Sequence, residues 1–505
     1  MGVDVKKGDD IMKIQELQTP AILLRAEAFN NNIKKYQSAC DEHGKQLWPM
    51  VKTHKSTDVA LMQQRVGASG FLCGTFDECE ALCERGIKNI MYAYPVAGEV
   101  SCRRAVELAK KCDFYVRVDS ISAASQLDKI AREAGITMKY TIILDCGLHR
   151  FGMPAEKILP FAEGMKQFTN LEFQGISTHC GHVYGEADAD KVPMYVEQER
   201  EAIHRAVDDL REAGFDVKMV TSGSTPTFWG SLSDDYVQIY HPGNYVFHDR
   251  IQIANRTATE EECALIVYAT VISNPREGLL ICDAGAKCLG LDQGAHGNSA
   301  VQGYGSVIGH PELLVTSLSE EVGKIQVTGA TDVQVGDRIM IIPNHSCSSA
   351  NLTNHYIVVD KDDNVVTKVS VDIRGNSTDK GVEIETKEEV KTEVVKEKKI
   401  VWPFWLNLAV AAFLPFFFWW ANTPTNLLYQ DMYGVVIEML GLFSMLVLCT
   451  LGIPVGIIGL IKAKNMKRFR VITRILSIIN LVVPIVVIGV LLVILIGAAT
   501  GYIHV

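Results

Sequence analysis

Short apolar segments alternate with amphipathic segments over the first 260 residues. After an early strand expected at 21–24, runs rich in β-forming residues recur, and positions between them such as Phe29, Ile33 and Tyr36 repeat with helical spacing. The expected strands lie near 47–52, 70–73, 90–93, 114–118, 140–145, 173–178, 217–221 and 237–240. Eight strands alternating with helices predict an α/β fold, a (β/α)8 TIM-type barrel over 15–260.

The pattern changes near residue 260 to strands separated by Gly and Asp turns. Segments such as ECALIVYATVIS, EGLLICDAG and VGDRIMIIPNH follow one another without helical spacing between them. They predict a separate β domain over 261–375. The early strand at 21–24 can pair with either unit, and the sequence leaves both alternatives open.

The C-terminal part of the chain differs from the rest in composition. Residues 376–400 are rich in Glu, Lys, Val and Thr and predict a charged tether. Residues 401–505 hold three apolar stretches, 401–421, 433–461 and 471–500, each long enough for a transmembrane helix. Lys396, Lys398 and Lys399 precede the first stretch, and Lys and Arg fill the second connection, whereas 422–432 has none. We therefore expect a multi-pass membrane protein with residues 1–375 on the cytoplasmic side.

Composition excludes some classes of protein. The formal net charge is −10 over 505 residues, which argues against a nucleic-acid partner. Hydrophobic residues make up 48% and charged residues 21%, so most of the chain should fold. The 13 cysteines follow no small-scaffold spacing, which predicts reduced thiols.

Chemically reactive residues fall at the ends of the expected barrel strands, where such barrels hold their active sites. Lys52 follows the first strand, and a lysine desolvated in a barrel mouth is a good amine nucleophile; a surface lysine is the alternative. Residues 221–227 and 241–245 follow the seventh and eighth strands and are rich in small residues whose backbone N–H groups suit a phosphate; ordinary turns are the alternative. A phosphate site facing a lysine predicts pyridoxal phosphate held as a Schiff base.

A candidate metal site lies in the β domain. In a strand, residues i and i+2 share a face, so His345 and Cys347 can share an ion. Imidazole plus thiolate favours Zn²⁺, and the lack of a second ligand cluster predicts an open site. Buried packing is the alternative for this pair.

Six segments resemble the D-threonine aldolase and D-serine dehydratase family. That family has an alanine-racemase-like barrel plus a β domain (fold type III), uses pyridoxal phosphate, and many members need a divalent metal. The resemblance covers about residues 15–375. The segments are 51–55 (VKTHK), 145–152 (DCGLHRFG), 179–184 (HCGHVY), 223–227 (GSTPT), 242–245 (PGNY) and 337–352.

The resemblance assigns roles to individual residues. It implies that Lys52 forms the Schiff base, that Arg150, His179 and Tyr184 line the cofactor, and that His345 and Cys347 bind the metal. The His-x-Cys spacing of these two residues is similar to that of zinc-dependent D-serine dehydratases. The implied phosphate-binding residues are Gly223, Ser224, Thr225, Gly243 and Asn244.

Two departures from the family pattern concern the substrate and the reaction. The family commonly reads Arg-Pro-His where this chain has Trp48, Pro49 and Met50, and Met50 should share the barrel-facing side of Lys52. A frequent Glu-Glu-His-Gly reads Glu-Glu-Val322-Gly here. Two histidines that could carry protons or bind metal are therefore missing.

These observations predict a lyase that acts on D-3-hydroxy amino acids with pyridoxal phosphate and Zn²⁺ or another divalent metal. Elimination to a keto acid and ammonia and aldol cleavage to glycine and an aldehyde both remain open, with Cys347 favouring elimination. An amino-acid racemase, with Tyr304 as a second acid, and a non-catalytic cofactor-binding protein tethered to a membrane are the alternatives. A homodimer is expected from the family, and the sequence leaves the identity of the amino acid open.

Overall fold

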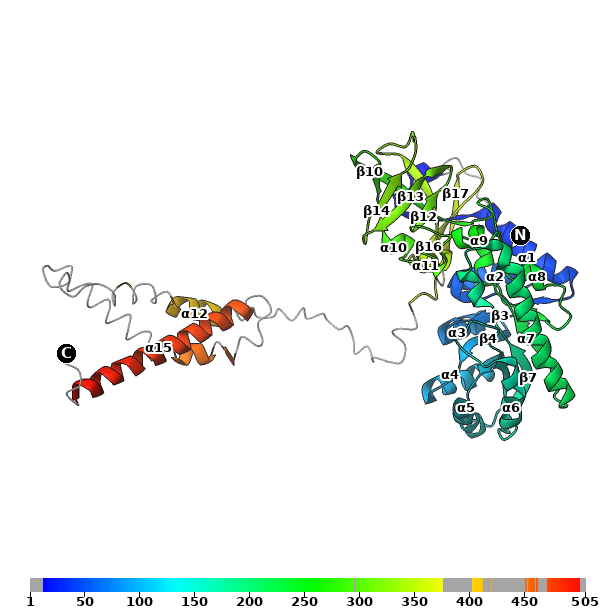
Figure 1. The fold of residues 1–505 in the computed structure, drawn as a ribbon, viewed down its shortest axis with the longest axis horizontal. Helices are drawn as coiled ribbons and strands as arrows, with labels where there is room; N and C mark the ends of the chain where they lie inside the picture. Colours follow the sequence, from blue (N-terminus) through cyan, green and yellow to red (C-terminus); the bar gives the residue numbers. More distant parts are fainter. Residues whose placement is uncertain are drawn as a thin grey trace. The chain divides into compact units, whose positions relative to one another are not determined.

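The computed structural model describes residues 12–294, 297–375, 402–411, 419, 450–451, 453–458, 460–461 and 470–499. The chain divides into two compact units, Met1–Val382 and Glu383–Val505. In the first unit, a barrel and a β domain are coloured blue to green and green to yellow in Figure 1. The expected tether at 376–400 lies outside the described residues.

Eight parallel strands form the barrel, as predicted. Their order is β2-β9-β8-β7-β6-β5-β4-β3, and a parallel bridge between Met50 and Leu72 closes the ring between β2 and β3. Each neighbouring pair is parallel, because a helical segment or a loop returns the chain to the start of the next strand. The strands are β2 Gln46–Leu47, β3 Phe71–Cys73, β4 Asn89–Pro95, β5 Asp113–Val118, β6 Met138–Ile143, β7 Leu171–Ser177, β8 Met219–Ser222 and β9 Ile239–Tyr240.

The helices between the strands cover the outside of the barrel (Figure 1). Ser56, Thr75 and Ser120 accept hydrogen bonds from the third residue of the helix that each precedes, and such caps contribute about 1 kcal/mol each. The apolar faces of these helices pack with the strands into one continuous core. The helices of this part are α1 Ala26–Glu42, α2 Thr57–Val66, α3 Phe76–Glu84, α4 Glu99–Ala109, α5 Ile121–Glu133, α6 Ala155–Met165, α7 Val192–Glu212, α8 Phe228–Ser231 and α9 Arg250–Ala254.

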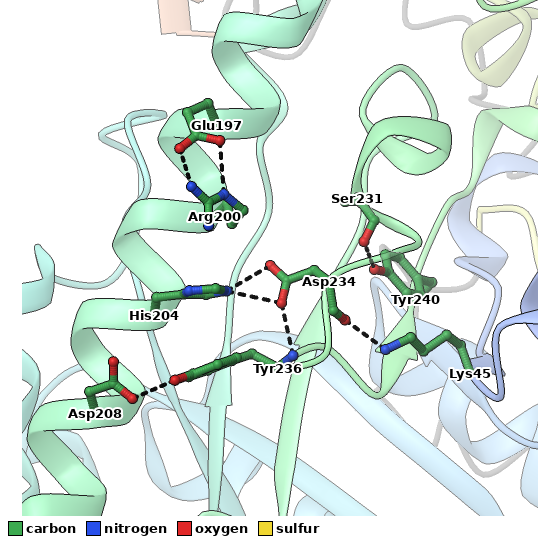
Figure 2. Close-up of polar contacts among 9 residues, drawn as sticks. All are labelled: Lys45, Glu197, Arg200, His204, Asp208, Ser231, Asp234, Tyr236 and Tyr240. Atoms are coloured by element: carbon green, nitrogen blue, oxygen red, sulfur yellow. Dashed lines mark hydrogen bonds and ion pairs between the residues drawn. The ribbon is translucent and has the colours of Figure 1, made fainter.

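Polar contacts fasten α7 to the segment that leads into β9 (Figure 2). His204 Nε2 lies 3.0 Å from Asp234 Oδ1, and Tyr236 Oη donates to Asp208 Oδ1 at 2.7 Å. Lys45 Nζ, just before β2, donates to the carbonyl oxygen of Asp234 at 2.6 Å. These contacts fix the segment just before β9, the strand that leads into residues 241–245.

The β domain is a nine-stranded sheet of order β11-β14-β13-β12-β15-β10-β1-β16-β17. The early strand belongs here: Ala21 to Leu24 pair antiparallel with β10, and Leu23 to Arg25 pair parallel with β16. Strands β12 and β13 were not predicted, because Gly and polar residues interrupt their apolar pattern. The strands are β1 Ala21–Arg25, β10 Leu265–Arg276, β11 Leu279–Cys282, β12 Gly305–Val307, β13 His310–Leu318, β14 Gly323–Val327, β15 Arg338–Pro343, β16 His355–Val359 and β17 Val365–Ser370, with the short helices α10 Ala286–Leu289 and α11 Ser346–Ala350.

The second unit corrects the predicted membrane location. Among its described residues, α12 spans Trp402–Ala411 and α15 spans Arg470–Ala499, and Asn480 Nδ2 donates to the carbonyl oxygen of Asn407 at 2.9 Å. Helix α12 is about half the length of a membrane span, and α15 buries the polar Thr473 and Ser477 together with Asn480.

No helix in the described part of the chain combines the length and the apolar character that crossing a membrane requires. The prediction of a multi-pass membrane protein with a cytoplasmic catalytic domain is therefore wrong. The apolar stretch predicted at 433–461 lies mostly outside the described residues.

Candidate functional site

One cavity at the carboxyl ends of the barrel strands, against the β domain, brings together almost every residue that the sequence singled out. Thr225 does not line it; that residue is fully buried, and its backbone N–H donates to Tyr184 Oη at 3.1 Å. The predicted residues that line the cavity are Lys52, Arg150, His179, Tyr184, Gly223, Ser224, Gly243, Asn244, His345 and Cys347.

Lys52 lies in a short turn of 3-10 helix, Val51–Thr53, and not in a strand as expected. Strand β2 ends at Leu47, and Met50, three residues later, forms the isolated bridge with Leu72 that closes the barrel. Met50 lines the same cavity, as its position two residues before Lys52 predicts. The amine and the first departure from the family pattern therefore share one cavity.

The two small-residue loops meet under the cavity. Gly223 has φ +157°, and a Cβ there would lie 2.5 Å from the backbone nitrogen of His241. A Cβ on Gly243 would lie 2.8 Å from Thr53 Oγ1. Only glycine allows the close approach of the backbone at Gly223 and of the Thr53 side chain at Gly243. The two loops thus form a cradle of the small-residue kind that suits a phosphate.

His179 is held as a neutral imidazole beside this cradle. Its Nδ1 donates to the carbonyl oxygen of Gly223 at 2.6 Å. Burial, with repulsion from the cations of Lys52 and Arg150, lowers the pKa of His179 to about 3. The Arg150 guanidinium is exposed and lies over the rings of Tyr94 and Phe151, at 5.8 and 5.2 Å from their centroids.

His345 and Cys347 come together, but in a different local structure from the one expected. Strand β15 ends at Pro343, so His345 precedes α11 and Cys347 lies within it. Burial raises the pKa of Cys347, but the positive charge of the neighbouring His345 and hydrogen bonds with His345 and Thr53 outweigh burial and lower that pKa. His345 therefore favours the charged form of the Cys347 thiol, and imidazole with thiolate is a donor set that a soft divalent ion prefers.

A carboxylate orients His345. Asp292 Oδ2 lies 2.7 Å from His345 Nδ1 and also accepts a hydrogen bond from Ser348 Oγ. The hydrogen bond with His345 lowers the pKa of Asp292 to about 2. With Nδ1 engaged, Nε2 is the nitrogen left for a metal, the usual arrangement of a metal-binding histidine.

Three charged groups at or beside the cavity, Arg117, Asp249 and Asp292, were not predicted from the sequence. Arg117 on β5 lines the cavity and is only 4% exposed, and burial lowers its pKa to about 9. A cation inside an apolar strand could have marked this position in the sequence. Asp249 also lines the cavity and accepts from Asn244 Nδ2 at 2.5 Å and from the Ser346 backbone N–H at 2.9 Å. Asp292 lies in a loop without periodicity, so no local signal could have found it.

Val322, the second departure from the family pattern, and Tyr304, the acid expected for a racemase, do not reach this cavity. Neither Val322 nor Tyr304 is among the described residues that line it. Tyr304 Oη instead accepts a hydrogen bond from Gln293 Nε2 at 2.9 Å. Of the two departures from the family pattern, Met50 is the one in contact with the site.

Known families and proteins match this architecture. The model for "Alanine racemase, N-terminal domain" matches residues 24–250, and that for "Putative serine dehydratase domain" matches residues 264–359. D-threo-3-hydroxyaspartate dehydratase of Delftia sp. is 31% identical over 367 residues, covering 70% of this chain and 96% of its own. D-serine dehydratase of Dictyostelium discoideum is 28% identical, and the match covers 70% of this chain and 96% of that protein. D-threonine aldolase of Arthrobacter is 27% identical, and the match covers 70% of this chain and 91% of that protein.

Solved structures agree with these relatives. A variant of D-threo-3-hydroxyaspartate dehydratase superposes with a TM-score of 0.67 at 29% identity, covering 71% of this chain and 96% of that one. Alanine racemase of Clostridium difficile 630, at 14% identity and a TM-score of 0.52, shares the fold. The chain therefore belongs to the D-threonine aldolase and D-serine dehydratase family of alanine-racemase-like, fold type III enzymes.

Proposed function

We propose that this chain is a pyridoxal-phosphate-dependent lyase that acts on D-3-hydroxy amino acids. The observation that carries the proposal is a single cavity lined by the Lys52 amine, by the cradle at Gly223 and Gly243, and by the His345 and Cys347 pair. Relatives over the same region are dehydratases and aldolases of D-serine, D-threonine and 3-hydroxyaspartate. Residues 15–260 would serve as the cofactor-binding barrel and residues 261–375 as the metal-binding β domain.

Each residue has a role that its position supports. Pyridoxal phosphate, when bound, supplies an electron sink for negative charge at the substrate Cα. Lys52 would hold its aldehyde carbon and then, once free, take the proton from Cα. The neutral His179 and the hydroxyl of Tyr184 would line the ring, and Arg150 lies at the open side, where a substrate carboxylate can reach it. The phosphate would be held by Gly223, Ser224, Gly243 and Asn244, with Thr225, which does not line the cavity, buried next to Ser224.

His345 and Cys347 would hold a divalent metal, for which imidazole and thiolate favour Zn²⁺. Such an ion supplies Lewis acidity toward the substrate 3-hydroxyl. Solved structures of D-threo-3-hydroxyaspartate dehydratase include a histidine variant and a cysteine variant at positions two residues apart, the latter metal-free. The same spacing separates His345 and Cys347, which supports a metal here.

The test is product analysis with the full-length chain, pyridoxal phosphate and Zn²⁺. D-serine, D-threonine and D-threo-3-hydroxyaspartate are each offered, and keto acid, ammonia, glycine and aldehyde are measured. We expect keto acid and ammonia in equal amounts, lost with a chelator and with Lys52→Ala but kept with Lys139→Ala at the opposite end of the barrel. Glycine and aldehyde would assign aldol cleavage within the same class. The L-enantiomer as product, or no product from any of the three, would overturn the proposal.

A further inference from the structure

A second group of metal-binding side chains lies between the loops that follow β6 and β7. The donor atoms of Cys146, Cys180 and His182 all lie within 4.8 Å of one another. Cys180 Sγ is 4.0 Å from both ring nitrogens of His182, and the two cysteines are 4% and 0% exposed. None of the three lines the cavity that holds Lys52.

Helix α7 fixes the orientation of this group. His182 Nε2 lies 3.1 Å from Gln198 Oε1, and because an amide oxygen only accepts, Nε2 carries the proton and Nδ1 keeps its lone pair. The His182 ring packs edge-on against Tyr195, at 5.0 Å between centroids. A partner that fixes the tautomer of a histidine is typical of the surroundings of bound metals.

The loop after β6 is shaped to admit the imidazole. Gly147 has φ +128°, and a Cβ there would lie 2.8 Å from His182 Nε2 and 2.7 Å from Gln198 Nε2. A side chain at position 147 would therefore have to displace the His182 ring or the Gln198 amide, and the positive φ favours glycine there.

We propose that Cys146, Cys180 and His182 bind a soft divalent cation, Zn²⁺, at a site separate from His345 and Cys347. With Zn–S near 2.3 Å and Zn–N near 2.0–2.1 Å, tetrahedral donors stand roughly 3.5–3.8 Å apart, so the side chains need only close in slightly. Each thiol loses its proton to solvent on binding, and the two thiolates neutralise the ion. His182 is half-buried, which leaves the fourth position to water.

The site would act as a clamp, and it stands independently of the proposed reaction. The loop after β6 carries Arg150, and the loop after β7 carries His179 and Tyr184. Joining Cys146 to Cys180 through one ion fixes these two loops relative to each other.

The test uses full-length protein carrying Cys347→Ala, which removes the thiolate of the other site. After exchange into Co²⁺, a sulfur-to-cobalt charge-transfer absorption reports metal bound to thiolates. We expect about one such ion per chain, lost when Cys146→Ser or Cys180→Ser is added. Gln198→Ala, an exposed position that leaves the fold intact, should weaken Zn²⁺ binding by about 10–100-fold.

The matched control is a second pair of neighbouring cysteines. Cys83 and Cys112 also lie close enough to interact, and Cys83→Ser with Cys112→Ser should leave the absorption unchanged. No thiolate absorption in the Cys347→Ala protein would overturn the proposal. So would an absorption that survives Cys180→Ser in a chain whose thermal unfolding is unchanged, or a Cys146–Cys180 disulfide in the purified protein with no bound metal.

Discussion

Asp292 Oδ2 lies 2.7 Å from His345 Nδ1, so a loop before β12 orients a residue at the end of β15. The pairing places the imidazole proton on Nδ1 and directs Nε2 toward the cavity. The same oxygen accepts from Ser348 Oγ, so Asp292 also fixes the start of α11, the helix that contains Cys347. One carboxylate thereby positions both proposed metal donors.

Removing this carboxylate should weaken the proposed metal site without removing a ligand. Asp292→Ala should raise the Kd for Zn²⁺ by about 10–100-fold, and Asp292→Asn, which keeps the acceptor but loses the charge, should fall between it and the parent protein. A competition titration with a coloured chelator measures both. Asp113→Asn, on the barrel surface, is the control, and equal affinity in all four proteins would contradict the prediction.

Lys52 should be the point of covalent attachment of pyridoxal phosphate. Borohydride reduction of the holoenzyme, followed by digestion and mass spectrometry, should find the label on the peptide containing Lys52. Lys52→Ala should show none and, because the proton transfer is lost, should lower kcat by about 10²–10⁴-fold or more. Label on Lys55, which is paired with Glu78, would contradict the assignment.

Gly223→Ala tests the cradle. Its Cβ would lie 2.5 Å from the His241 nitrogen, and alanine at φ +157° is strained, so we expect weaker retention of pyridoxal phosphate and a loss of more than about 1 kcal/mol of stability. Gly214→Ala is the matched control, because its φ of +83° is also positive but nothing lies within 4 Å of the new Cβ. Equal cofactor retention in the two variants would argue against a phosphate at Gly223.

The barrel could be predicted because each of its strands is recognisable from the local pattern of apolar residues. Apolar runs spaced by amphipathic helices identify eight strands wherever they pair, and boundaries differ by a few residues where chain closure intervenes, as at Met50. The pairing of β1 could not be predicted in this way. Its apolar residues, such as Leu23, suit a barrel and a β domain equally, and long-range packing against β10 and β16 decides between them.

The site was predicted where its residues are close together in the sequence. His345 and Cys347 were found as a motif, although a helix and not a strand presents them. Asp292 escaped, because its partner His345 lies 53 residues away in the chain. Asp249 escaped although Asn244 is only five residues away, because its other partner, Ser346, lies 97 residues away. The apolar C-terminal stretches were misassigned, since composition alone does not show how α12 and α15 pack through Asn407 and Asn480.

Glu199 lies on α7 behind the cofactor cradle and should make stability depend on pH. It is 1% exposed, and burial raises its pKa to about 7 against hydrogen bonds from Ser222 and Thr227, which lower it. Between pH 4.5 and 7 the folded chain therefore keeps a proton that the unfolded chain releases. Its contribution to the free energy of unfolding is greatest below pH 4.5 and is lost as pH rises through 7.

Glu199→Gln should remove this loss, because an amide does not titrate. Relative to the parent protein, the free energy of unfolding of the variant should rise between about pH 5 and pH 8 by on the order of 3 kcal/mol. Urea unfolding at several pH values measures the difference between the two proteins. The buried His54 and His248 make the free energy of unfolding change with pH in the opposite direction, but they are present in both proteins, so their effect cancels in the difference. Glu197→Gln, two residues earlier on the exposed side of α7 where Figure 2 shows it paired with Arg200, is the control and should follow the parent protein. A difference between Glu199→Gln and the parent that stays constant over this pH range would mean that Glu199 is ionised in the folded chain throughout.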